Sequence, residues 1–317
     1  MESKFATFAF YNVENFYAKD RVNESSFLPS NFTKWQEGRY DEKVAKIAYT
    51  IAKIGETETQ DYPLLVGFSE VENQSVLEDL IQHNNLIQAN YQAILFPSLD
   101  ERNINVGCIY RKDLIQILNS EPIRVVFKNQ NNEKSYTRDI LFLKAKLANE
   151  MVYFFILHLP SKLDLEVNLL KRSILLNKIK SKINEIKAEE KEPKIIIMGD
   201  FNDSPTADNL REILNTNASA DTLKADEFYN PMVKLMSYKR GSLVHKKQWM
   251  LFDQILFSAS FFASNSKIIY QKTEIFDAPF LTVTRSKYGS FPFRTFIGTK
   301  YLGGYSDHFP VYTIIKY

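Results

Sequence analysis

The chain has 317 residues, of which 44% are apolar and 14% aromatic, a composition typical of a globular protein with a sizeable core. Lys and Arg number 40 against 38 Asp and Glu, so the net charge of +2 neither requires nor excludes a polyanionic partner. No apolar run approaches about 18 residues, and the single cysteine excludes an intramolecular disulfide. We expect one domain over residues 1–317, without an integral membrane segment and cytoplasmic as given, with a trimmed leader left open.

Hydrophobic periodicity predicts many strands and a few long helices. Strands are expected at residues 5–11, 64–68, 92–96, 106–110, 123–127, 140–147, 152–157, 195–198, 251–257 and 311–315. Helices are expected at residues 41–54, at 74–87, where Ser75 and Glu78 have capping-box spacing, and at 165–186. The segment 267–304 is aromatic, basic and weakly periodic, which favours a loop covering a site. This pattern predicts an α/β protein with two packed mixed sheets flanked by helices.

A polar run follows one of the most apolar strands. Residues 199–203 read Gly-Asp-Phe-Asn-Asp directly after the strand expected at 195–198. Such a strand is buried on both faces, and Gly199 allows a tight turn at its end. Two carboxylates and a carboxamide then crowd one rim, where a cation, a proton or hydrogen bonds must compensate their charge. The run predicts metal or phosphate chemistry, with an Asx-rich turn as the alternative.

Similar polar clusters lie at the ends of other expected strands. They are Asn-Val-Glu-Asn at 12–15, Glu-Val-Glu-Asn at 70–73, His-Leu-Pro-Ser-Lys at 158–162 and Tyr-Ser-Asp-His at 305–308. Asp253 interrupts an apolar strand, where a buried carboxylate needs a partner. A hard cation such as Mg²⁺ binds oxygen ligands of this kind, whereas zinc prefers more His and Cys than the chain offers.

In chain order these clusters resemble the signature blocks of the endonuclease/exonuclease/phosphatase superfamily, which has the DNase I-like fold. The blocks are Asn, Glu, His-x-x-Ser, Gly-Asp-x-Asn, a strand Asp and Ser-Asp-His, and they extend from Asn12 to His308. The resemblance implies a four-layer α/β/β/α sandwich of two mixed, mainly antiparallel sheets flanked by helices. It also implies a metal-dependent hydrolase of phosphate esters that uses Mg²⁺, with Mn²⁺ as a substitute.

The same resemblance implies a metal site on three oxygen-bearing side chains. Glu70 corresponds to the principal metal carboxylate, and Asn12 and Asp307 complete or approach the site. Glu14 and Glu72 lie beside these residues in the sequence. They are either further metal ligands, or else solvated turn residues or partners of Lys and Arg side chains.

The resemblance implies that Asp200 and Asn202 orient the attacking water and contact the scissile phosphate. Asp203 is expected in a turn or as a helix cap. Asp253 is expected to pair with His308, and the resulting imidazole would bind the phosphate or transfer a proton.

A second histidine, His158, corresponds to a catalytic histidine of the DNase I branch and is the candidate general acid to the leaving oxygen. Asp139 is the expected acidic partner of His158, and Arg138 a candidate phosphate contact. A surface turn is the alternative for these two residues. Ser161 and Lys162 complete the expected substrate-binding set.

The substrate is less well defined by the sequence. Basic and aromatic residues at 239–249 and 285–300 would follow a phosphate backbone and stack bases, or else form a solvated face. The leading hypothesis is a nuclease that cleaves DNA or RNA through an activated water. The alternatives are a phosphatase or phosphodiesterase acting on inositol phosphates or phospholipids, and a catalytically inactive scaffold. A lipid substrate is disfavoured because no apolar membrane-inserting hairpin is evident.

Overall fold

Two large sheets organise the protein. The structure is a computed structural model that describes residues 4–20, 35, 38–128, 132–161, 165–237, 239–285, 289–298 and 300–317. One sheet has six strands in the order β16-β21-β1-β2-β4-β3, and the other has seven in the order β11-β12-β15-β10-β9-β8-β5. Within them β1–β2, β9–β10 and β11–β12 are parallel, and the other described pairs are antiparallel. The prediction of mixed, mainly antiparallel sheets is confirmed.

The six-stranded sheet contains β1 Phe5–Phe16, β2 Leu65–Val71, β3 Tyr91–Leu95, β4 Asn105–Arg111, β16 Ile269–Ile275 and β21 Val311–Lys316. The seven-stranded sheet contains β5 Gln116–Ile123, β8 Ile140–Leu147, β9 Glu150–His158, β10 Lys194–Asp200, β11 Thr216–Asn217, β12 Phe228–Tyr229 and β15 Asp253–Ser258. Small hairpins pair β6 Phe127–Lys128 with β7 Lys134–Ser135, β13 Leu243–His245 with β14 Gln248–Met250, β17 Thr282–Arg285 with β18 Gly289–Pro292, and β19 Phe296–Ile297 with β20 Lys300–Tyr301.

The α-helices are α1 Arg39–Lys53, α2 Glu56–Thr59, α3 Gln74–Gln82, α4 Leu165–Glu189, α5 Asp208–Ile213 and α6 Met232–Leu235. Three short 3₁₀ turns are η1 Ile87–Ala89, η2 Ala259–Phe262 and η3 Pro279–Leu281. None of the helices in the described part of the chain is both long and apolar enough to cross a membrane.

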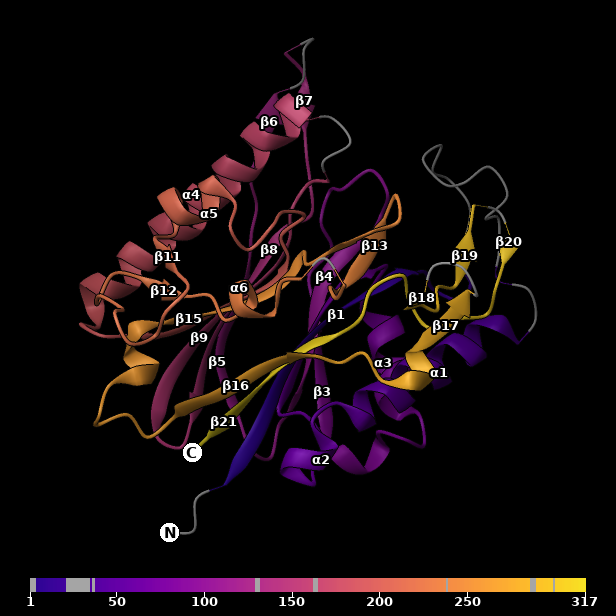
Figure 1. Ribbon diagram of the computed structural model, residues 1–317, viewed down its shortest axis with the longest axis horizontal. Coiled ribbons are helices and arrows are strands. Elements are labelled where there is room, and N and C mark those ends of the chain that lie inside the picture. Colours follow the sequence, from indigo (N-terminus) through magenta and orange to yellow (C-terminus); the bar gives the residue numbers. More distant parts are fainter. Residues whose placement is uncertain are drawn as a thin grey trace.

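The hydrophobic core divides into three layers of side chains. The central layer lies between the sheets, where the rings of Phe8 and Phe154 meet edge to face at 5.2 Å. One outer layer joins the six-stranded sheet to α1 and α3, and the other joins the seven-stranded sheet to α4 and α5 (Figure 1). Each sheet therefore buries both faces, which explains the unbroken apolar strands and confirms the four-layer sandwich.

The topology brings several strand ends to one edge of the sandwich. Because β1 and β2 run parallel, Asn12 and Ser69 are register partners, and Glu70 follows Ser69. In the other sheet, Asp200 of β10 is in register with His158 of the parallel β9 and with Asp253 of the antiparallel β15. The polar clusters predicted at strand ends therefore share one edge.

Three local predictions are wrong for physical reasons. The strand expected at 123–127 is split, because β5 ends at Ile123 and Phe127 begins the small β6–β7 hairpin. The segment 267–304 is not simply a loop, because it contains β16, an edge strand with little two-sided burial. The helix expected at 74–87 ends at Gln82, and its N-cap is Asn73, whose side chain accepts the N–H of Val76.

Candidate active site

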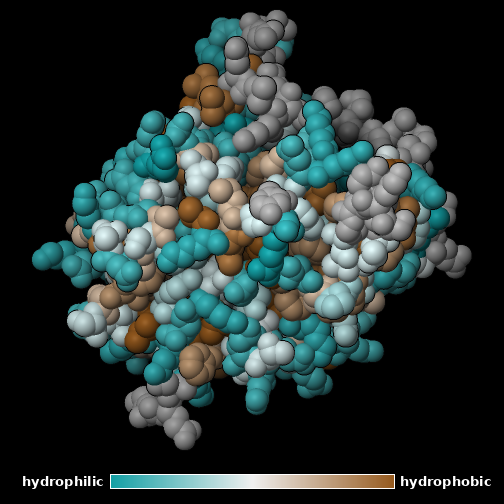
Figure 2. Space-filling model, in the orientation of Figure 1, coloured by the Kyte–Doolittle hydropathy of each residue, from teal (hydrophilic) through white to brown (hydrophobic). Residues whose placement is uncertain are grey.

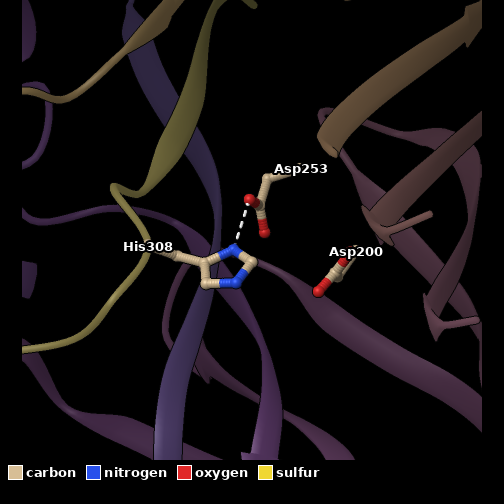
Figure 3. A group of neighbouring side chains, drawn as sticks. All are labelled: Asp200, Asp253 and His308. Atoms are coloured by element: carbon tan, nitrogen blue, oxygen red, sulfur yellow. Dashed lines mark hydrogen bonds and ion pairs between the residues drawn. The ribbon is translucent and has the colours of Figure 1, made fainter. Parts of the chain in front are cut away.

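His308 and Asp253 form a buried pair at the strand edge. His308 Nδ1 lies 2.7 Å from Asp253 Oδ2, and Asp253 is fully buried (Figure 3). Burial alone would lower the pKa of His308, but the Asp253 carboxylate outweighs it and raises that pKa well above the usual value. The pair is the one expected from the sequence, and it holds His308 as an imidazolium cation at neutral pH.

The loop before β21 holds His308 against the first strand of the other sheet. Ser306 Oγ donates to the Asn12 carbonyl at 2.6 Å and accepts the His308 N–H at 3.1 Å. Phe309 N–H donates to the Ser242 carbonyl, and Ser242 Oγ accepts the Asp253 N–H. The backbone of the pair is therefore fixed on both sides.

Asp200 lies opposite this pair and is contacted by residues of both sheets. Its Oδ1 accepts the Asn202 N–H at 2.9 Å, and its Oδ2 accepts the Asn12 side-chain amide at 3.1 Å. Burial, followed by the facing Asp253 carboxylate, raises the pKa of Asp200 to about 7. Asp200, Asp253 and His308 form a compact group whose ligand atoms all lie within 4.8 Å of one another (Figure 3).

Asn202 and Asp203 complete the turn after β10. Asn202 has a positive φ of 49° and donates its side-chain amide to the Leu159 carbonyl at 2.9 Å. Asp203 accepts the Ser204 N–H and lies 3.5 Å from an Arg172 nitrogen. Helix α5 begins only at Asp208, so Asp203 belongs to the turn and does not cap a helix.

His158 lies beside Asp200 but differs from His308 in charge. Its Nε2 is 3.6 Å from Asp200 Oδ2, too long for a hydrogen bond, and its buried Nδ1 has no hydrogen-bond partner among the described residues. Burial and the nearby Arg138 and Arg102 guanidinium groups lower the pKa of His158 well below the usual value. His158 is therefore a neutral imidazole with one unsatisfied ring nitrogen.

Asp139 is not the partner of His158 in the structure. Its carboxylate is bound through two nitrogens of Arg124, at 2.7–3.1 Å. Because Ile123 and Ile140 are register partners, the residues just beyond them, Arg124 and Asp139, meet at the end of the β5–β8 ladder. The expected His158–Asp139 pair is a wrong prediction, since a guanidinium competes for the carboxylate with two hydrogen bonds.

Arg138, Ser161 and Lys162 were also expected to contact the substrate. Arg138 is buried and donates to Asp100 at 3.2 Å, while its Nε lacks a hydrogen-bond partner among the described residues. Ser161 is half-buried, and its carbonyl lies 3.5 Å from an Arg172 nitrogen. Lys162 lies outside the described residues.

The expected metal residues lie at the same edge as Asp200. Glu70, which has a positive φ of 64°, accepts the Asn15 N–H at 2.8 Å and lies 3.8 Å from an Arg102 nitrogen. Asp307 accepts a hydrogen bond from Arg294 at 2.9 Å. The two carboxylates lie outside the compact group of three, and Asn12 connects to that group through Asp200.

Glu14 and Glu72 are buried and bound to the protein. Glu14 accepts the Thr295 N–H at 2.6 Å and an Arg294 nitrogen at 3.3 Å. Burial, followed by the Asp307 carboxylate, raises the pKa of Glu14 to about 7. Glu72 accepts the Ala18 N–H at 2.6 Å. Glu14 thus has an arginine partner, whereas Glu72 contacts a backbone N–H and the Asn103 amide.

Several cations of the site were missed in the sequence. Lys43 is buried on α1, and its ammonium donates to Thr295 Oγ at 2.6 Å. Burial lowers the pKa of Lys43 to about 8, although Glu14 and Asp307 oppose the shift. A signal was present, because Lys43 falls on the apolar face of α1. Arg102 occurs in an irregular segment, where no comparable pattern identified it. Arg294 belongs to the basic and aromatic segment 285–300, which was expected to follow a phosphate backbone or form a solvated face.

The donor set at this edge fits a hard divalent cation. Glu70, Asn12 and Asp307 offer only oxygen atoms, which suit Mg²⁺ better than zinc. The compact group is less suited to a metal, because His308 Nδ1 is engaged with Asp253.

The fold and this edge define a hydrolase of phosphate esters. Residues 7–317 match the model of the Endonuclease/Exonuclease/phosphatase family, and the chain belongs to that family. No curated protein matched the chain in a sequence comparison.

Solved structures show the same fold at low sequence identity. A Bacteroides thetaiotaomicron protein described as an endonuclease/exonuclease/phosphatase family protein has a TM-score of 0.61 and 15% identity, covering 100% of this chain and 96% of its own. A D. rerio TDP2 complexed with single-strand DNA product has a TM-score of 0.57 and 15% identity, covering 98% of both chains. A mannosyl-6-phosphatase from B. thetaiotaomicron has a TM-score of 0.57 and 15% identity, covering 98% of this chain and 99% of its own.

Proposed function

We propose that this protein hydrolyses phosphodiester bonds of DNA or RNA through an activated water, with Mg²⁺ as cofactor. The observation that carries the chemistry is the group of Asp200, Asp253 and His308, in which a carboxylate and an imidazolium face one another. The carboxylate accepts a proton, and the imidazolium offers positive charge to a phosphate. The family relationship supports phosphate ester hydrolysis, and the nucleic acid substrate is our proposal.

Asp200 and Asn202 orient the attacking water in this proposal. A general base works best when its pKa lies near the working pH, and the pKa of Asp200 is raised to about 7. The two hydrogen bonds from Asn202 and Asn12 keep the carboxylate from rotating. Asp200 can therefore accept the proton of the water without losing its position.

The two histidines take different roles because their charges differ. His308, held as a cation by Asp253, binds the phosphoryl oxygens or donates a proton to them. His158 was expected to be a general acid, but a neutral imidazole has no extra proton to donate at neutral pH. We propose that His158 Nδ1 or Nε2 forms a hydrogen bond with the substrate, and that an anionic phosphate raises the pKa of His158 on binding.

Glu70, Asn12 and Asp307 would hold the Mg²⁺. When bound, the ion would supply positive charge that stabilises the phosphorane-like transition state. Arg294 binds Asp307, and Arg102 lies beside Glu70. Both arginines hold these carboxylates in place and partly neutralise their negative charge.

Two adjoining cavities favour a nucleic acid over a small phosphate ester. A cavity of about 270 Å³ is lined by Asp307, Arg294, Lys247 and Phe291, among other residues. A neighbouring cavity of about 790 Å³ shares Lys247 and Phe291 with it and includes Trp249. Cationic and aromatic side chains together suit phosphates and bases, and the two cavities offer more space than one small molecule needs.

The test is an assay panel with wild type, Asp200→Asn and Asp208→Asn. Substrates are single-stranded and duplex DNA, RNA, bis-p-nitrophenyl phosphate, inositol phosphates and sugar phosphates, each in Mg²⁺ and in EDTA. Asp200→Asn should lose most turnover and still fold, because the amide has the size of the carboxylate; its NH2 would face one of the two N–H donors, so a small loss of thermal stability is expected. Asp208, an exposed carboxylate on α5, is the matched control and should be silent. Near wild-type activity of Asp200→Asn would sink the assignment.

A phosphatase of small esters is the second candidate. The cavity of about 270 Å³ beside Asp307 has the size for a sugar or inositol ring, and one neighbour in fold is a mannosyl-6-phosphatase. Preference for sugar or inositol phosphates in the panel would replace the nuclease proposal with this one. Metal-dependent turnover on none of the substrates would favour a scaffold.

A further inference from the structure

A group of exposed aliphatic side chains lies at one corner of the molecule. Their exposures are 63% for Leu170, 55% for Val126, 48% for Leu169 and 39% each for Val167 and Ile174. We call these five residues the aliphatic patch. Water-exposed Leu, Ile and Val side chains are ordinary when scattered, but several together on one surface usually mark an interaction site.

Two elements that are distant in sequence build the aliphatic patch. Val167, Leu170 and Ile174 share one face of α4 at helical spacing, and Val126 directly precedes β6. Lys171 joins the two elements, because its ammonium lies 5.5 Å from the centre of the Phe127 ring and 3.3 Å from Ser135 Oγ. The helix and the segment beside β6 are therefore neighbours, and the patch spans both elements.

The patch is convex. In Figure 1 the first turns of α4 and the β6–β7 hairpin project together at the upper end of the molecule. Figure 2 shows hydrophobic side chains at the surface in this upper part of the molecule, with hydrophilic ones near them. A protruding surface suits insertion into a soft layer better than the binding of a small molecule.

Basic side chains surround the aliphatic patch. Lys128 and Lys134 are exposed on the β6–β7 hairpin, and Lys171 and Lys178 flank the exposed face of α4. On the described part of the hairpin, Lys128 and Lys134 stand against one acidic residue, Glu133. Positive charge around an aliphatic centre is the pattern of surfaces that bind anionic lipids. Two copies of this patch would bring the lysines together, which disfavours self-association.

We propose that the aliphatic patch binds a membrane surface rich in anionic phospholipids. The aliphatic side chains enter the acyl boundary, and the surrounding lysines contact the headgroup phosphates. This inference does not depend on which phosphate ester the active site hydrolyses.

The patch is fixed relative to the active site. Arg172, which follows Lys171 on α4, is buried and donates to the Pro160 carbonyl at 3.2 Å. Its second terminal nitrogen lies 3.5 Å from Asp203. Pro160 and Asp203 belong to the segments that follow His158 and Asp200, so membrane binding would set the orientation of the catalytic edge.

The test is co-sedimentation with vesicles in EDTA, which removes bridging by divalent ions. The vesicles contain phosphatidylcholine alone or equal parts of phosphatidylcholine and phosphatidylglycerol. The variants are Val126→Glu/Leu170→Glu and Lys128→Glu/Lys134→Glu, and the matched control is Ile87→Glu, whose side chain is 49% exposed elsewhere. Thermal denaturation and sedimentation without vesicles establish that each variant is folded and monodisperse.

We expect wild type and Ile87→Glu to bind the anionic vesicles equally. Both double variants should bind them roughly tenfold or more weakly, because aliphatic burial or phosphate attraction is lost. Equal binding to both vesicle types would overturn the proposal, as would binding by the double variants at the wild-type level. Absence of wild-type binding would also overturn it, and none of these results bears on the hydrolysis assay.

Discussion

Replacing Asp253 by Asn tests how the charge of the site is controlled. The carboxylate is fully buried and bonded to His308 Nδ1 at 2.7 Å. An amide has nearly the same shape and can still accept the N–H of the ring. The substitution therefore removes one negative charge while keeping the geometry.

The size of the effect follows from that distance. An opposite charge in contact with an ionisable group shifts its pKa by about 1–3 units. Asp253 is the largest influence that raises the pKa of His308; without it only Asp200 and Asp307 oppose the effect of burial, so that pKa falls. The imidazolium fraction at neutral pH falls with it, and each pKa unit lost would lower kcat by up to about tenfold.

The same substitution weakens the role of His308 but favours that of Asp200 as a base. The Asp253 carboxylate is the second cause, after burial, that raises the pKa of Asp200 to about 7. Removing that charge lowers the pKa of Asp200, so the base remains ionised to lower pH. Both effects move the optimum of the Asp253→Asn variant to lower pH, where its activity should partly recover.

The assay combines a pH–rate profile with NMR of the imidazole nitrogens. The chain has only four histidines, so the His308 signals can be assigned by substitution of the other three. The reasoning is refuted if the His308 pKa is unchanged in Asp253→Asn. It is also refuted if kcat falls equally at all pH values, because the loss would then come from geometry rather than from charge.

Three further outcomes test the fold and the charge balance. Gly199→Ala should destabilise the protein by about 2–4 kcal/mol in urea, because the new Cβ would lie 2.2 Å from the Leu157 carbonyl oxygen. Partial burial raises the pKa of Glu58, but hydrogen bonds outweigh burial and lower that pKa to about 2. Glu58 therefore contributes stability above about pH 4.5, and this stability is lost as the pH falls toward 2. In Glu58→Gln the urea midpoint should no longer depend on pH in this range. The free energy of unfolding involved is about 1 kcal/mol after solvent screening. Arg294→Met should tighten Mg²⁺ binding roughly threefold to tenfold in calorimetry, because Asp307 loses its internal cation; unchanged or weaker binding would contradict this.

The sequence identified the interior strands and the order of the site residues. The strand expected at 195–198 is the centre of β10, which is buried along its whole length. Such strands carry unbroken apolar runs because helices and the second sheet cover both faces. Asn12, Glu70, Asp200, Asp253 and His308 were recognisable because each lies next to such a run.

Edge strands and ion pairs were not predictable in the same way. The edge strands β5 and β16 have largely exposed or half-buried side chains, so their sequences lack the apolar pattern. Asp139 was misassigned because its partner, Arg124, meets it only through the register of β5 with β8. Arg294 reaches Glu14 across 280 positions of sequence, and no local pattern reports such a contact.

The catalytic edge depends on the packing of the two sheets. Asn12 belongs to one sheet and Asp200 to the other, and their side chains meet at 3.1 Å. His308 enters from the loop before β21 of the first sheet, whereas Asp253 begins β15 of the second. The Asn12–Asp200 and His308–Asp253 contacts therefore both join one sheet to the other. A change in the distance between the sheets would alter the proton affinity of the base and the charge of the acid together, which couples the core of this protein directly to its chemistry.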